Sequence, residues 1–232
     1  MKGIGSIVLL LIAPLCMYSQ VRELNATAAI GDSEGTVSIL VTHDWELWKS
    51  KKFAIGVGAR FTSYFGANQY YVTAPAKITS GSTGPLVIFK ENIEENMDTF
   101  LIQSPQVNSL NILINLRYKF SEKIMVGFNI DAIGFSFGGS KRGDYINGAV
   151  GGTEDSKPTS FNILLISDND RGSLNSELYG KYYFNERWGI KVAAQFHFTE
   201  YTTETEVQQF PEPNDRFRNK SLMFALGVTR KL

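Results

Sequence analysis

Apolar and polar residues alternate along most of the chain after residue 20. Eight segments follow a period of two, the side-chain period of a β-strand with one apolar and one polar face. They are residues 22–31, 36–48, 53–65, 106–120, 124–137, 172–184, 188–202 and 219–231. Every proline after residue 20 falls between these segments. Because proline cannot donate a hydrogen bond to a neighbouring strand, this distribution supports eight paired strands.

The connections between the predicted strands alternate in length. Residues 49–52, 121–123 and 185–187 form tight charged turns between an aromatic strand end and an apolar strand start, a pattern typical of hairpins. The long connections are residues 66–105, 138–171 and 203–218. The chain is therefore predicted to run up and down, with the short turns at one end of an antiparallel sheet and the long loops at the other.

The two faces of the predicted strands differ sharply. One face is apolar, as in Ile190, Val192 and Phe196, and its runs match the length of about 9–11 residues that a tilted strand needs to cross a bilayer. The other face carries glycines and the charged residues Asp44, Glu46, Arg60, Arg117, Asp131, Glu177, Lys181 and Lys191. Aromatic residues gather near the short turns, as at a membrane interface. We therefore expect lipid on the apolar face; the alternative is a soluble barrel or sandwich with that face inside.

The N-terminus has the layout of a secretory signal peptide. Met1-Lys2 supplies positive charge, residues 3–17 are mostly apolar, and charged residues resume at Arg22. Residues 1–20 are thus predicted to be the export signal and residues 21–232 the mature domain. Cys16 is the only cysteine, so the mature domain is expected to contain no disulfide and no thiol site.

With 23 basic and 23 acidic residues the chain has no net charge, and nucleic acid is not an expected partner.

In strand number, loop asymmetry, aromatic positions and export signal, the chain resembles the small outer-membrane β-barrel proteins of Gram-negative bacteria. It is similar to the membrane domain of outer membrane protein A. The resemblance implies an all-β fold: an eight-stranded antiparallel up-and-down transmembrane β-barrel in the cell outer membrane, with short periplasmic turns and long external loops. Many such proteins end on an aromatic residue that assists assembly, whereas this chain ends on Leu232.

The charged face is predicted to form an ion-pair network in the lumen. Counting outward from the 185–187 turn places Lys181 opposite Lys191, and Glu177 and Glu46 are the expected carboxylate partners. Unpaired charges in a narrow interior are costly, and eight strands enclose only enough space for side chains. A structural plug is therefore favoured, and the alternative is a narrow channel for small or hydrophobic solutes.

No pattern in the chain predicts catalysis, a metal site or a cofactor. His43 and His197 lack a serine at a nucleophile elbow. Asp168-Asn169-Asp170 begins like a calcium loop, but Tyr179 stands where the bidentate glutamate is required. The chain is therefore not expected to be an enzyme; a lipid-modifying barrel enzyme and a soluble secreted binder remain further alternatives.

The expected function is structural, or a surface interaction through the long external loops. Residues 66–105 and 203–218 each carry two more acidic than basic residues, and both display aromatic residues. Such residues on loops above a rigid scaffold suggest contact surfaces, although they could equally pack on one another as extensions of the strands. The expected partners are outer-membrane lipids and an unidentified extracellular or envelope partner that contacts residues 66–105, 138–171 and 203–218.

Overall fold

A computed structural model describes residues 20–147 and 150–232. The predicted export signal lies outside these residues, apart from Gln20, which begins the first strand. Within the described ranges, 13 strands join into one antiparallel sheet, so the expectation of an all-β antiparallel fold is confirmed. No helix in these ranges is both long enough and apolar enough to cross a membrane.

Eight long strands correspond to the eight alternating segments, with ends that differ from the expected ones by three residues at most. Long strands form there because a period of two gives each strand one face that packs inward and one that points outward. Their bounds are β1 Gln20–Ile30, β2 Glu34–Leu47, β3 Phe53–Gly66, β6 Gln106–Lys119, β7 Ile124–Phe137, β11 Leu174–Tyr183, β12 Trp188–Thr203 and β13 Arg216–Lys231.

The long connections contain five further strands, so eight was too low as a count for the whole sheet. They are β4 Gln69–Thr73, β5 Thr99–Ile102, β8 Lys141–Asn147, β9 Val150–Pro158 and β10 Phe161–Ile163. β4, β5 and β10 are too short to show a period, while β8 and β9 are mostly polar and therefore carry little apolar alternation. The same connections hold the helix α2 Ala76–Ser80 and the 3-10 turns η2 Pro85–Phe89, η3 Glu94–Asn96 and η4 Ser167–Asn169.

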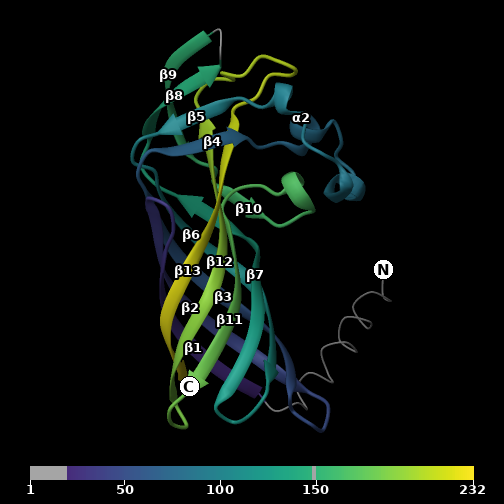
Figure 1. Cartoon of the computed structure of the whole chain (residues 1–232), viewed down its shortest axis with the longest axis vertical. Helices are drawn as coiled ribbons and strands as arrows, with labels where there is room; N and C mark the ends of the chain where they lie inside the picture. Colours follow the sequence, from purple (N-terminus) through teal and green to yellow (C-terminus); the bar gives the residue numbers. More distant parts are fainter. Residues whose placement is uncertain (1–19, 148–149) are drawn as a thin grey trace, which may run out of the picture.

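The strand pairings form a ring of 12 strands with a cross-connection. Successive long strands pair from β1 through β2, β3, β6, β7 and β11 to β12. The ring then passes through β9, β8, β5 and β4 to β13, which pairs with β1. β12 and β13 also pair directly, from Trp188 opposite Arg230 to Thr202 opposite Arg216. In Figure 1 the long strands form a tall barrel, and β4, β5, β8 and β9 lie beyond the end opposite the C-terminus.

The barrel of long strands is apolar outside and polar inside. On β12, Ile190, Val192 and Phe196 are exposed, whereas Lys191 and Gln195 are buried. The same alternation holds on the other long strands, where the burial patterns switch between exposed and buried at nearly every residue. The distribution is the inverse of that in a water-soluble barrel.

The short strands β4, β5, β8 and β9, here called the outer strands, enclose a conventional apolar core. It is built mainly from aromatic residues of both the short and the long strands: Tyr64, Tyr71, Phe100, Ile102, Val107, Tyr145, Tyr201 and Phe217. Each of these side chains is nearly or fully buried, and the rings of Phe100 and Phe217 lie 5.5 Å apart. The extension of the barrel is therefore a packed unit rather than a set of loose loops.

The apolar outer face predicts a depth-dependent response to charge. Leu226 lies opposite Val192 near the middle of β13, and we expect Leu226→Arg to destabilise the barrel in lipid vesicles by about 2–4 kcal/mol. Thr153→Arg, at an exposed position of β9, should change the unfolding free energy by less than about 0.5 kcal/mol. Denaturant titration of both variants in vesicles tests this, and equal effects would contradict a lipid-facing position for Leu226.

Candidate functional site: the charged barrel interior

The end of the barrel near the short turns contains an inner cluster of Glu23, Asp44, Glu46, Arg117 and Lys181. Arg117 lies with Nε 3.3 Å from Asp44 Oδ2 and with Nη2 3.7 Å from Glu46 Oε1. Lys181 Nζ lies 2.5 Å from Glu23 Oε2. The cluster joins β1, β2, β6 and β11 across the lumen, so its ion pairs hold opposite walls of the barrel together.

A middle cluster lies farther from the turns and consists of Arg60, Asn129, Asp131, Glu177 and Lys191. Lys191 Nζ lies 2.7 Å from Glu177 Oε2, which also accepts a hydrogen bond of 2.9 Å from Asn129 Nδ2. Arg60 lies 3.4 Å from Glu177 and 3.6 Å from Asp131, and its Nη2 donates to Asn129. Each charged group here thus has an opposite charge within 4 Å.

Tyr179 connects the two clusters. Its hydroxyl donates to Asn115 Oδ1 at 2.8 Å, and Asn115 Nδ2 donates to Asp44 Oδ1 at 2.8 Å. The ammonium groups of Lys181 and Lys191 lie 4.8 and 5.3 Å from the centre of its ring. On the opposing strand, a side chain at Gly127 would collide with the Tyr179 ring, which explains a glycine at that inward position.

The eight residues expected in the lumen network divide equally between the clusters. The pairing register places Lys181 opposite Lys191, and Glu177 contacts Lys191 as expected from the sequence. The expected role of Glu46 is wrong, because Glu46 lies next to Arg117 and Lys119 rather than next to either of these lysines. Lys181 instead pairs with Glu23.

Sequence reasoning missed Glu23, although a signal for it was present. Glu23 has the same parity as Asn25 and Thr27 on the first strand, and all three side chains are buried. Attention to this parity would have placed its carboxylate in the lumen. His197 also points inward, and its ring lies 5.5 Å from that of Tyr64.

Close packing leaves little room for solvent around these charges. None of the eight residues is more than 7% exposed, and Arg60 and Lys191 are each 1% exposed. Long charged side chains with so little exposed surface lie almost wholly within the protein. The arrangement can brace the barrel electrostatically.

An outer cluster, which the sequence did not predict, lies where β12 and β13 leave the barrel. Glu200 accepts hydrogen bonds from Arg216 Nε at 2.9 Å and from Arg218 Nη2 at 2.8 Å. Asp168 lies 3.5 Å from Arg218 and 2.6 Å from Lys220. Glu200, Arg216 and Arg218 share the outward parity of Phe196 and Leu222, so they are on the outward side of the strands.

Asp170 holds the loop that covers this cluster. Burial raises the pKa of its carboxyl above the ordinary value, although the hydrogen bond from the Leu165 backbone N–H and the charge of Arg218 act in the opposite direction. Arg218 also donates to the backbone carbonyl of Asp170. The pairs of Asp168 with Arg218 and Lys220 form only when residues 164–172 fold back onto the barrel, so strand periodicity could not reveal them. Glu200, by contrast, lies directly opposite Arg218 on the paired strands.

Aromatic side chains complete the outer face near the short turns. Trp48, Phe120, Phe184 and Trp188 are all exposed there, next to an apolar belt that surrounds a charged interior. Aromatic rings at the edge of an apolar belt are typical of the membrane–water interface. The chain has the fold of a membrane β-barrel.

Solved structures of other β-barrel proteins are similar to the chain. The chain is similar to Neisserial surface protein A, with a TM-score of 0.39, 8% identity, and coverage of 92% of this chain and 96% of that one. It is also similar to Ail of Yersinia pestis in complex with the heparin analogue sucrose octasulfate, with a TM-score of 0.38, 6% identity, and coverage of 93% of this chain and 100% of that one. For the N-terminal β-barrel domain of Pseudomonas aeruginosa OprF, the TM-score is 0.34 and the identity 12%, with coverage of 91% of this chain and 97% of that one.

Neither a family model nor a curated protein matches the sequence.

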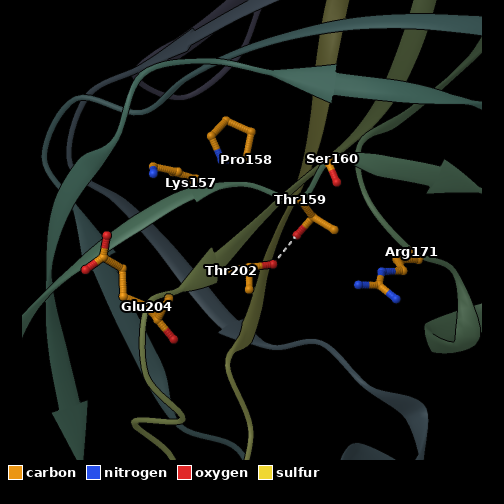
Figure 2. A pocket seen from close by; sticks show the side chains of 8 residues that line it. Lys157, Pro158, Thr159, Ser160, Arg171, Thr202 and Glu204 are labelled. Carbon is orange, nitrogen blue, oxygen red and sulfur yellow. Dashed lines mark hydrogen bonds between the residues drawn. The ribbon is translucent and has the colours of Figure 1, made fainter.

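The outer strands also border a surface cleft of about 400 Å³. Figure 2 shows Lys157 and Glu204 on one side of this cleft and Arg171 on the other. Between them, the hydroxyls of Thr159 and Thr202 are 2.8 Å apart. The cleft mixes charges of both signs.

Throughout the described ranges, no group of three or more His, Cys, Asp or Glu residues is placed to hold a metal ion.

The middle cluster predicts a large effect of a conservative substitution. Glu177→Gln leaves Lys191 without its carboxylate partner in a buried site, and we expect a loss of about 3–5 kcal/mol in unfolding free energy. Lys77→Ala breaks the exposed pair with Glu212 and should cost at most about 1 kcal/mol. Denaturant unfolding in vesicles measures both, and a Glu177→Gln variant as stable as wild type would show that the cluster does not brace the barrel.

Proposed function

We propose that the chain is a structural outer-membrane protein that presents a folded surface outside the cell. In this proposal the eight long strands form the membrane-spanning barrel, with the short turns in the periplasm and the outer strands outside. The direct pairing of β12 with β13 supports an eight-strand ring, because it completes the ladder of long strands below the outer strands.

The observation that carries the proposal is the paired, buried charge in the lumen. A transport pathway needs polar groups that contact water or solute, whereas these groups contact one another at 2.5–4.0 Å. The lumen is therefore proposed to be a structural plug. The exposed apolar belt makes outer-membrane lipids the partner of the barrel wall, since water would contact that belt at high cost.

The outer strands are the proposed contact surface for an extracellular or envelope partner. Residues 66–105, 138–171 and 203–218 pair into strands around a buried aromatic core. Tyr71, Phe100 and Phe217 belong to that core, whereas Tyr70 and Phe210 are exposed. A rigid surface loses less conformational entropy on binding than a set of flexible loops. We propose no enzymatic activity for it.

Conductance distinguishes a plug from a channel. In planar bilayers we expect wild type to show no steady ion current, because the charged side chains fill the lumen. The double variant Arg60→Ala/Glu177→Ala removes one cation and one anion, so it opens space without changing the net charge, and its conductance should rise. Val192→Ala, on the outward face, is the matched control and should behave as wild type. A large steady wild-type current would favour the narrow channel instead.

Location and orientation can be tested together in bacterial cells. A protease site inserted after Gly152, in the strand β9, should be cleaved in intact cells, whereas one inserted after Glu186, in a short turn, should be cleaved only after lysis. The protein should fractionate with the outer membrane and change gel mobility on boiling, because a closed barrel satisfies its backbone hydrogen bonds internally. The opposite cleavage pattern would reverse the orientation, and recovery in the soluble fraction would exclude a membrane barrel.

A further inference from the structure

Two segments of the long connections place apolar side chains on the surface beside the barrel. In η2, Leu86 and Phe89 are 67% and 77% exposed, Ile88 is also exposed, and only Val87 is buried. Leu165 and Ile166, which precede η4, are exposed as well. Residues 85–89 and 164–169 are here called the lateral foot.

The lateral foot continues the apolar belt of the barrel. Phe161 and Ile163 of β10 pair with Phe135 and Ile133 of β7. Immediately afterwards, the Leu164 N–H donates to the Ala132 carbonyl at 2.8 Å. Phe161, Phe135 and Ile133 are exposed on the belt, so the chain passes directly from the belt into the foot. Figure 1 shows the η4 loop and the segment after α2 projecting on the same side, at the outer end of the long strands.

Contacts within the structure fix the shape of the foot. Thr83, Pro85, Leu165, Ile166 and Asn169 line one cleft of about 340 Å³ between its two segments. The Leu165 N–H donates to Asp170 Oδ1 at 2.6 Å. The segment that follows η2 is held because the Ile93 N–H donates to the Thr79 carbonyl at 2.7 Å. The apolar side chains are thus presented by an ordered scaffold.

We propose that the lateral foot rests in the outer leaflet of the membrane, with its apolar side chains at the boundary between headgroups and acyl chains. The proposal depends on the membrane location proposed above. Continuity with the belt selects lipid as the occupant, because the same bilayer that covers Phe135 and Phe161 reaches the adjoining residues Leu165 and Ile166.

Charged residues set the depth of this contact. Lys90 directly follows Phe89, and the exposed residues Glu91, Glu94 and Glu95 come next. Charges so close to the apolar side chains keep the segment out of the hydrocarbon centre and restrict it to the interface. Lys90 is placed to meet the anionic groups of lipid headgroups, while the glutamates remain in water.

Site-specific fluorescence tests the lateral foot. The full chain with Cys16→Ser has no cysteine, so Phe89→Cys can carry a single environment-sensitive nitrobenzoxadiazole label. After insertion into phosphatidylcholine–phosphatidylglycerol vesicles, lipids with a nitroxide near the headgroup end of the acyl chain should quench most of its fluorescence. Leu226→Cys, on the belt, is the control that must contact lipid, and its label should be quenched by lipids with a nitroxide near the end of the acyl chain. Gly152→Cys, at an open position of β9, is the control that should stay unquenched.

The controls separate failure of the foot from failure of the membrane location. Gel mobility before and after boiling first establishes that each labelled chain is a closed barrel. Quenching at residue 226 but not at 89 overturns the lateral foot alone and would favour a protein partner for it. Absence of quenching at 226 overturns the membrane location itself. Quenching at 89 and 226, with none at 152, is the result expected from the proposal.

Discussion

In a bilayer every backbone N–H and C=O must find its partner within the protein, and here the pairing of β12 with β13 is central to that requirement. These two strands belong both to the ladder of long strands and to the 12-strand ring that runs through β4, β5, β8 and β9. Without their direct pairing, the lower part of the barrel would have two open edges. The aromatic core also depends on them, because it includes Tyr201 of β12 and Phe217 of β13.

Enclosure by the long strands determines the chemistry of the barrel interior. Side chains from opposite walls meet in the lumen, and a charge there has little water to solvate it. Removing ions from water costs several kcal/mol each, which ion pairing only partly offsets. The paired arrangement of Arg60, Glu177 and Lys191 is thus better explained by the fixing of strand register than by a large gain in stability. A shift of one residue along a strand would turn these charges toward lipid.

The sequence predicts the part of the fold that obeys a local rule. Period-two alternation located all eight long strands and the inward side of residues such as Asp131 and Lys191. The same rule was uninformative for β8 and β9, whose residues are mostly polar and whose pairing depends on distant strands. Partners within the lumen are also set by shear between strands, so Lys181 meets Glu23 rather than Glu46. The lateral foot and the contacts of Asp168 with the outer cluster depend on loop folding, which has no periodic signature.

At the level of the outer cluster and the aromatic core, the two faces of β12 and β13 exchange their chemical character. Along β12, the outward side changes from Phe196 to Glu200, while the inward side changes from Gln195 to Tyr201. β13 makes the same exchange, from Leu222 to Arg218 outside and from Ser221 to Phe217 inside. Both inversions fall at one level of the paired strands. Because the loop of residues 164–172 covers Glu200 and Arg218, which are buried, the same level marks where the outward face of these two strands stops being apolar and exposed and becomes charged and covered by protein.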